Sequence, residues 1–223
     1  AEINLIKKFN KKKIVNGFTT NPSLMRKAGA KNYLDYCKKI LKICKNKPIS
    51  FEVFADDFNN MKHQAYKLNS LAKNVYVKIP VCNSKGKFSG KIIKLLNREK
   101  IKLNITAVYN AKQTKRILDC IDRKTNVIIS IFVGRAGDVG KDPVPEIKKS
   151  IAMSKKFKNV KILWASVREP YNYTHAKELK CDIITVPPTI IEKIENFGKT
   201  FQKLTIETIK NFLVDSKKSN FKI

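Results

Sequence analysis

The sequence has few acidic residues and few histidines, and it lacks long apolar runs. Only 18 of its 223 residues are Asp or Glu, and two are His. No apolar run approaches the roughly 20 residues that a membrane-spanning helix needs. The first residues do not place an apolar core after a basic segment, as a secretory signal would. We therefore expect no membrane partner and no signal peptide.

Cysteine chemistry is also poorly represented. The five cysteines are scattered, and no two of them have the Cys-x-x-Cys spacing. None lies at zinc-ligand spacing from a histidine. Such a set is typical of reduced thiols in a cytoplasmic protein. We expect no disulfide, no metal site and no cofactor, and a cytoplasmic location.

Basic residues are abundant, and they give a formal net charge of +29. A nucleic-acid-binding surface is one interpretation, but such surfaces usually cluster arginine and aromatic residues on one face. Here 41 of the 47 basic residues are lysines, spread along the whole chain. We expect no nucleic-acid partner, and a positive field that attracts phosphorylated substrates. A catalytically impaired barrel with a basic binding surface remains an alternative.

Short β-rich runs alternate with amphipathic helical segments. The predicted strands are Ile14–Thr20, Ile49–Ala55, Val75–Pro80, Lys102–Val108, Asn126–Val133, Val160–Ser166 and Asp182–Pro187. Several are apolar nearly throughout, which is typical of parallel strands covered on both faces. The predicted helices are Glu2–Phe9, Lys31–Lys45, Asp57–Leu71, Asn110–Ile121, Pro145–Ser154 and Thr189–Asn196. The alternation indicates a parallel α/β sheet.

The number of predicted strands is one short of a closed barrel. No linker divides the chain, so we predict a single domain over residues 1–223. We expect a (β/α)8 TIM barrel whose first β-strand belongs before Ala1 and is missing from this chain. An open doubly wound sheet is the alternative, but its dinucleotide-binding form usually carries G-x-G-x-x-G, which the sequence lacks.

Two charged residues lie inside apolar strands. An ammonium group is costly in a buried strand, and loss of water favours the neutral amine, so Lys78 is a candidate nucleophile. Its alternative is a lysine that extends to solvent. Glu52 is a candidate general acid and base acting through a water molecule. Its alternative is a structural carboxylate paired with a cation such as Lys78.

Further polar residues follow the predicted strands, where parallel barrels hold their functional groups. They are Thr19, Thr20, Asn21, Asn104, Thr106, Ser130, Arg135, Ser166 and Arg168. Arg135 and Arg168 are two of only six arginines, and guanidinium forks match phosphate geometry. A surface salt bridge is the alternative for either arginine.

Six ordered motifs at strand-like spacing resemble those of the transaldolase / fructose-6-phosphate aldolase family. They are G-F-T-T-N-P-S-L at 17–24, S-F-E-V at 50–53, V-K-I-P at 77–80, L-N-I-T at 103–106, S-I-F-V-G-R at 130–135 and A-S-V-R at 165–168. The resemblance covers essentially the whole chain and implies class I aldolase chemistry in a barrel. The family's first strand ends in an Asp-Thr-Ala-like segment, so we expect its Asp to be missing with that strand.

The resemblance also implies roles for individual residues. Lys78 forms a Schiff base with the ketose, and Glu52 and Thr106 position the water that moves protons. The remaining substrate-binding residues, including those for the phosphate, are Thr20, Asn21, Asn104, Ser130, Phe132, Arg135, Ser166 and Arg168. No metal or cofactor is implied, because the iminium itself accepts the electrons.

The resemblance predicts transfer of a dihydroxyacetone unit between sugar phosphates such as fructose 6-phosphate and erythrose 4-phosphate. This activity belongs to pentose phosphate or related sugar-phosphate metabolism. An aldolase that releases dihydroxyacetone is the alternative. That branch carries Gln and Tyr where this chain has Glu52 and Phe132, which favours transfer. Family members often self-associate, so we expect a homo-oligomer.

Overall fold

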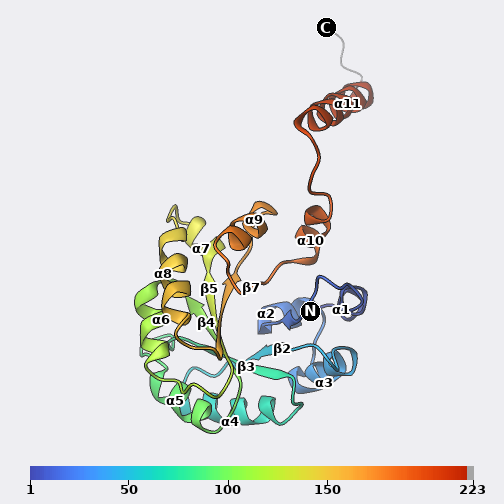
Figure 1. The fold of residues 1–223 in the computed structure, drawn as a ribbon. Coiled ribbons are helices and arrows are strands. Elements are labelled where there is room, and N and C mark those ends of the chain that lie inside the picture. The colour runs from blue at the N-terminus through green and yellow to red at the C-terminus, as the bar shows by residue number, and fades with distance from the viewer. Residues whose placement is uncertain (220–223) are drawn as a thin grey trace.

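The structure, a computed structural model, describes residues 1–219 and contains one curled sheet of seven parallel strands. Their order in the sheet follows the chain, as Figure 1 shows. The strands are β1 (Phe18–Thr19), β2 (Ile49–Glu52), β3 (Val75–Pro80), β4 (Leu103–Val108), β5 (Val127–Phe132), β6 (Val160–Ala165) and β7 (Ile183–Ile184). All seven lie within the predicted ranges, which confirms the parallel α/β class.

Helices precede, connect and follow these strands, and most of those between strands lie along the outer side of the sheet (Figure 1). They are α1 (Ile3–Asn10), α2 (Pro22–Lys27), α3 (Tyr33–Ile43), α4 (Phe58–Asn69), α5 (Gly90–Arg98), α6 (Ala111–Leu118), α7 (Val133–Gly137), α8 (Val144–Ser154), α9 (Tyr171–Glu178), α10 (Pro188–Ile194) and α11 (Phe201–Ser219). The sequence did not predict α2, α5, α7, α9 or α11. Three of these, α2, α7 and α9, have eight residues or fewer, too short for a clear helical period.

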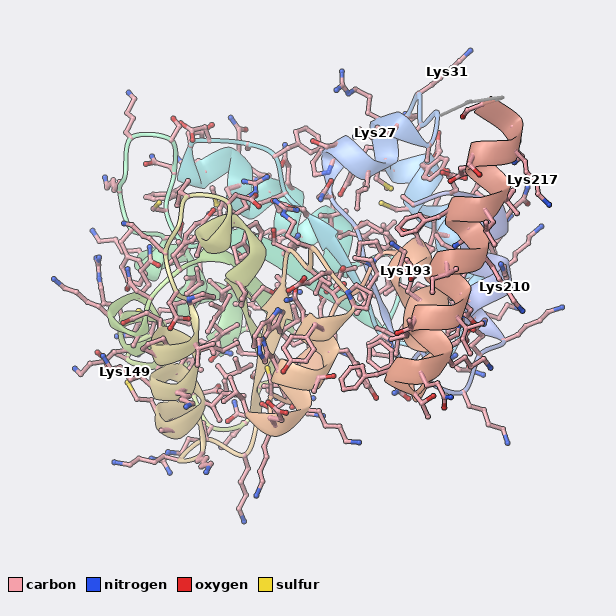
Figure 2. All side chains as sticks on the ribbon, turned by 90° about the horizontal axis from the view of Figure 1, so that it is seen from above. Lys27, Lys31, Lys149, Lys193, Lys210 and Lys217 are labelled. Atoms are coloured by element: carbon pink, nitrogen blue, oxygen red, sulfur yellow. The ribbon has the colours of Figure 1, made fainter. Side chains whose placement is uncertain are left out.

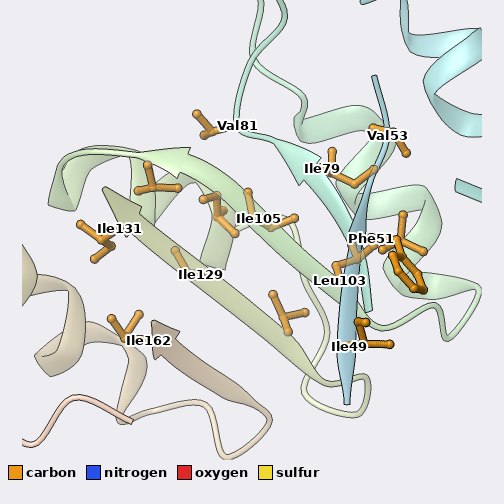
Figure 3. Packing of buried hydrophobic residues seen from close by; sticks show 14 of the residues in the cluster. Ile49, Phe51, Val53, Ile79, Val81, Leu103, Ile105, Ile129, Ile131 and Ile162 are labelled. Carbon is orange, nitrogen blue, oxygen red and sulfur yellow. The ribbon is translucent and has the colours of Figure 1, made fainter. Parts of the chain in front are cut away.

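Alternate residues of the strands form the core between the sheet and the helices. Figure 3 labels ten of them: Ile49, Phe51, Val53, Ile79, Val81, Leu103, Ile105, Ile129, Ile131 and Ile162. Because neighbouring residues of a strand point to opposite faces, the remaining strand residues face the concave side. A second, smaller cluster of Ile128, Leu163 and Ala165 lies among those residues. Burial on both faces explains the nearly unbroken apolar runs.

The two edge strands of the sheet approach each other through side chains. The Thr19 and Thr185 hydroxyl groups are hydrogen-bonded at 2.7 Å, next to β1 and β7. Lys8 forms an ion pair with Glu192 at 2.7 Å and so links α1 to α10. Within residues 1–219 no strand lies between β1 and β7. The sheet is thus a curled half-barrel, and a strand before Ala1 stays a prediction.

Helix α11 differs from the rest of the chain because it has no buried residue. It extends away from the sheet and the other helices (Figure 1). Its exposed apolar side chains include Phe201, Phe212 and Leu213, which are 89%, 66% and 56% exposed. No helix within residues 1–219 combines the length and hydropathy that crossing a membrane requires.

The lysines lie mainly on the outer surface. The six that Figure 2 labels come from different parts of the chain: Lys27, Lys31, Lys149, Lys193, Lys210 and Lys217. All six are exposed. These six lysines are therefore spread over the surface, as lysine is along the sequence.

Candidate functional site

Strand register brings three of the predicted residues into one row. Glu52 on β2 pairs with Lys78 on β3, and Lys78 pairs with Asn104 on β4. Register partners in a parallel sheet present their side chains to the same face. The three side chains therefore project together into the concave side, near the carboxyl ends of the strands. That edge is where parallel α/β barrels hold their functional groups.

Lys78 is buried, with only 7% of its surface exposed. Its Nζ lies 3.0 Å from Oε2 of Glu52. It also donates a 3.4 Å hydrogen bond to the carbonyl oxygen of Thr20. Lys78 therefore does not extend to solvent, and the alternative of an exposed lysine is wrong. The alternative given for Glu52, a carboxylate paired with a cation such as Lys78, is present. The two groups are close enough for a proton to pass between them.

Glu52 is held at its backbone by a residue that the sequence did not single out. The Tyr33 hydroxyl, from the start of α3, donates to the Glu52 carbonyl at 2.9 Å and accepts from the Glu52 N–H at 3.1 Å. Tyr33 lies in the predicted amphipathic helix Lys31–Lys45, where a tyrosine is compatible with simple core packing. No pattern in the chain marks a tyrosine hydroxyl that reaches a neighbouring strand.

Asn104 joins three strands through its amide group. Its Nδ2 donates to Ser50 Oγ at 2.9 Å, and its Oδ1 accepts from Ser130 Oγ at 2.6 Å. All three residues are buried. The hydrogen bonds fix the amide beside Lys78. Ser130 contacts Asn104 in this arrangement, and its predicted phosphate-binding role stays a prediction.

Thr106 lies one alternate position beyond Asn104 on β4. It is 1% exposed, and its hydroxyl has no hydrogen-bond partner within the described residues. The next residue, Ala107, has a φ of 59°, at the point where the register between β4 and β5 shifts. A buried hydroxyl without a partner, next to a strained backbone position, is typical of a site that receives a ligand or water.

Two predicted residues at the end of β1 contribute to local structure. The Asn21 side chain accepts a 2.8 Å hydrogen bond from the Leu24 N–H and caps α2. The Thr20 hydroxyl donates to the Ser50 carbonyl at 2.9 Å. Both bonds hold the β1–α2 turn against β2, beside Lys78. Contact with substrate stays a prediction for both residues.

The arginines lie at the same edge of the sheet but are more exposed. Arg168 forms an ion pair with Asp138, with its Nε 2.9 Å from Oδ1. The Arg168 guanidinium holds the pKa of the Asp138 carboxyl below its ordinary value. Arg135 is exposed and lies over the Phe132 ring, 5.4 Å from its centroid. The salt bridge expected as an alternative is present for Arg168.

Close backbone packing joins the two arginine segments. A Cβ atom at Gly134 would lie 1.7 Å from the carbonyl oxygen of Ser166, so only glycine fits there. Ser166 itself has a φ of 64°, in the left-handed region. This contact holds the short helix α7 against the end of β6. It therefore fixes Arg135 and Arg168 relative to each other.

Metal and thiol chemistry find no support in the residues described. Within 1–219, no three His, Cys, Asp or Glu side chains gather closely enough to hold a metal ion. All five cysteines are free thiols. Burial raises the pKa of Cys37 to about 12 and the pKa of Cys44 and Cys181 to about 11, so these thiols are poor nucleophiles.

The curled parallel sheet, with a buried lysine and carboxylate at its carboxyl edge, defines an α/β protein of the barrel type. A solved structure, described as the first monomeric dihydrodipicolinate synthase variant, matches with a TM-score of 0.58 at 10% identity. The match covers 83% of this chain, and this chain spans 63% of the length of that one. At this identity the likeness shows the fold alone.

Sequence comparison identifies the family. The Transaldolase/Fructose-6-phosphate aldolase family matches residues 1–223, and the chain belongs to this family. A probable transaldolase of Methanococcus maripaludis is 33% identical over 96% of this chain and 94% of its own length. One of Nitrosopumilus maritimus is 33% identical over 93% and 94%, and one of Bdellovibrio bacteriovorus is 34% identical over 100% and 97%. This is a family of enzymes that act on sugar phosphates.

Proposed function

We propose that the chain is a cytoplasmic transaldolase that transfers a dihydroxyacetone unit between sugar phosphates through a Schiff base on Lys78. The observation that supports this proposal most strongly is the enclosed pair of Lys78 Nζ and Glu52 Oε2, 3.0 Å apart. The pair lies at the edge of the sheet where barrel enzymes carry out their chemistry. The proposal includes a (β/α)8 barrel completed by a strand that precedes Ala1 and carries the family's Asp.

The proposed chemistry begins with transfer of the Lys78 proton to Glu52, which leaves a neutral amine. The amine attacks the ketose carbonyl, and a water molecule held by Glu52 and Thr106 moves protons while the hydroxyl leaves as water. The resulting iminium accepts the electron pair when the C3–C4 bond breaks, the C4 hydroxyl gives its proton to the Asp of the preceding strand, and an aldose phosphate departs. The three-carbon enamine then attacks the acceptor aldehyde, whose oxygen takes that proton back, and hydrolysis frees Lys78.

Substrate binding is divided along the sheet edge. Arg135 and Arg168 bind the phosphate, because a guanidinium offers planar, charge-assisted hydrogen bonds to its oxygens. Asp138 engages Nε and one terminal nitrogen of Arg168, which leaves other N–H groups for the ligand. The remaining residues in this proposal line the space between lysine and arginines: Thr20, Asn21, Asn104, Ser130, Phe132 and Ser166.

Borohydride trapping tests the Schiff base directly. The protein is reduced in the presence of fructose 6-phosphate, and the adduct is located by intact mass and peptide mapping. We expect one adduct, on Lys78. Lys161, an exposed lysine on β6, provides the control: Lys161→Met should keep the adduct, and Lys78→Met should lose it. An adduct on another residue would overturn the assignment.

Transfer and simple cleavage differ in their products. With fructose 6-phosphate alone, a transaldolase retains the three-carbon unit on the protein. With added erythrose 4-phosphate, it forms a new seven-carbon ketose phosphate. Release of free dihydroxyacetone at the same rate with and without acceptor would favour the aldolase alternative.

We also propose that the chain self-associates through α11. Helices in proteins gain most of their stability from packing an apolar face, so this exposed 19-residue helix needs a packing partner. Its apolar side chains Phe201, Ile209 and Phe212 lie on one face, opposite Lys203 and Lys210. Light scattering should report an oligomer that Phe212→Ser weakens and Lys210→Ser leaves intact. A monomeric wild-type protein would contradict this proposal.

A further inference from the structure

The backbone N–H and C=O of Glu52 point to the side of β2 on which its neighbour β1 has already ended. In a parallel strand, alternate residues direct their N–H and C=O groups to the same neighbour. Ser50 accepts from the Thr20 N–H on the β1 side, and the Val53 N–H donates to Lys78 on the β3 side. Glu52, two residues after Ser50, therefore faces β1. But β1 ends at Thr19, so within residues 1–219 no strand residue pairs with the Glu52 backbone.

The Tyr33 hydroxyl takes the place that a further residue of β1, beyond Thr19, would occupy next to Glu52. It both donates to the Glu52 carbonyl and accepts from the Glu52 N–H, at 2.9 and 3.1 Å. Burial raises the pKa of this hydroxyl well above its ordinary value, so it keeps the proton that it donates. One neutral phenol thus satisfies both backbone groups of the residue that carries the carboxylate.

Two further contacts fix the tyrosine itself. Its ring packs edge-on against Phe54, with the ring centroids 5.3 Å apart. Tyr33 is the first residue of α3, and the Asn32 side chain caps that helix by accepting from the Asp35 N–H at 3.1 Å. These two contacts therefore fix the position of the Tyr33 hydroxyl relative to the Glu52 backbone. Neither contact involves Lys78 or the arginines.

We propose that Tyr33 is a positioning residue that sets the Glu52 carboxylate against Lys78. The proposal rests on the proposed Schiff-base function and names a residue that acts on it through Glu52. Without the hydroxyl, the backbone N–H and C=O of Glu52 both lose their partner at the end of the strand. The backbone at Glu52 can then rotate, and the 3.0 Å contact between Oε2 and Nζ is no longer maintained.

The test compares Tyr33→Phe with Tyr36→Phe. Tyr36 lies on the same helix, and its hydroxyl donates to the Ala1 and Ala28 carbonyls at 3.0 and 3.3 Å, away from Lys78. Each variant loses one hydroxyl that is bonded to backbone. We expect Tyr33→Phe to lower kcat about tenfold with KM for fructose 6-phosphate unchanged, because catalytic geometry changes and ligand contacts do not. We expect Tyr36→Phe to change neither constant.

A double-mutant cycle with Glu52→Gln separates positioning from general loosening. If Tyr33 acts through the carboxylate, then Tyr33→Phe lowers kcat much less in the Glu52→Gln background than in wild type. An equal loss in both backgrounds would overturn the proposal. So would equal losses of kcat in Tyr33→Phe and Tyr36→Phe.

A readout without sugar distinguishes failure of this inference from failure of the proposed function. Reductive methylation by formaldehyde and cyanoborohydride at one fixed pH, mapped to Lys78 by mass spectrometry, gives the reactivity of that amine. The ion pair with Glu52 holds the Lys78 ammonium, so we expect Lys78 to be methylated about twofold faster in Tyr33→Phe and in Glu52→Gln than in wild type. An unchanged methylation rate in Tyr33→Phe overturns the positioning role. If wild type forms no adduct with fructose 6-phosphate but the methylation rate changes, only the proposed function fails.

Discussion

The two halves of the site differ in how the protein holds its charges. The lysine side, formed by Glu52, Lys78 and Asn104, is enclosed and hydrogen-bonded to neighbouring strands. The arginine side, formed by Arg135 and Arg168, faces solvent, and the Arg168 side chain is 50% exposed. A nucleophilic amine requires exclusion of water and a fixed proton acceptor. A phosphate site needs charges that an incoming anion can reach. Under the proposed function, chemistry therefore belongs to the lysine side and phosphate recognition to the arginine side.

Removal of the lysine should have the largest effect. Lys78→Met deletes the nucleophile, so we expect kcat to fall by about three orders of magnitude or more. The variant also leaves Glu52 without its cation. Steady-state transfer assays measure the effect, and Lys161→Met should stay near wild type. Substantial residual transfer in Lys78→Met would show that the lysine side does not carry the chemistry.

The arginine side should affect binding more than turnover. Arg168→Met removes charge-assisted hydrogen bonds to phosphate, so we expect KM for fructose 6-phosphate to rise about 10- to 100-fold with a smaller change in kcat. Unphosphorylated fructose is the control, and its weak turnover should not change. A similar loss with both sugars would mean that Arg168 supports the fold instead of recognising phosphate.

The contact that joins the arginine segments should be sensitive to a single methyl group. Gly134→Ala places a Cβ against the Ser166 carbonyl, at 1.7 Å if nothing moves. We expect a loss of ~3 kcal/mol in the free energy of unfolding, because backbone must shift to relieve this overlap. Gly137→Ala, on the same helix, is the matched control because its Cβ would meet nothing within 4 Å. Equal unfolding midpoints for the two variants would contradict the close packing of α7.

The smallest effect should come from Asp138. Asp138→Asn removes the charge of the Arg168 partner but keeps a hydrogen-bond acceptor, so we expect a change in KM of only a few fold. Because the pKa of Asp138 is lowered, its ion pair is complete above the ordinary carboxyl range and is lost as pH falls through the lowered value. The substrate phosphate itself titrates between pH 8 and 5, so KM should change with pH there, and the change should be the same in wild type and in Asp138→Asn. A rise that Asp138→Asn abolishes would show that the carboxyl titrates higher.

Much of the fold followed from local patterns. The range Val75–Pro80 was predicted without error, because a central strand that is buried on both faces is apolar throughout. The edge strands were predicted too long: Ile14–Thr20 contains only Phe18–Thr19 as strand. An edge strand ends where it no longer forms backbone hydrogen bonds with its one neighbour. That point depends on two segments, so the sequence of one segment does not predict it.

The site residues were predictable only as candidates. Glu52 and Lys78 were conspicuous because charges are costly inside apolar strands. Their 3.0 Å contact depends on the register between β2 and β3, which long-range packing decides. Tyr33 was hidden, because a tyrosine on an amphipathic helix is compatible with simple core packing. Asp138 was not among the predicted site residues, and it pairs with Arg168.

The sequence by itself determined the alternation of strands and helices, the family, and which residues carry reactive groups. These depend on side-chain chemistry and on spacing within single segments. The tertiary structure alone decided that Lys78 is enclosed beside Glu52, that Tyr33 takes the place of a strand that has ended, and that Arg168 shares its charge with Asp138. Each of these contacts joins segments far apart in the chain. Their geometry follows from sheet register and curvature, which no local pattern encodes.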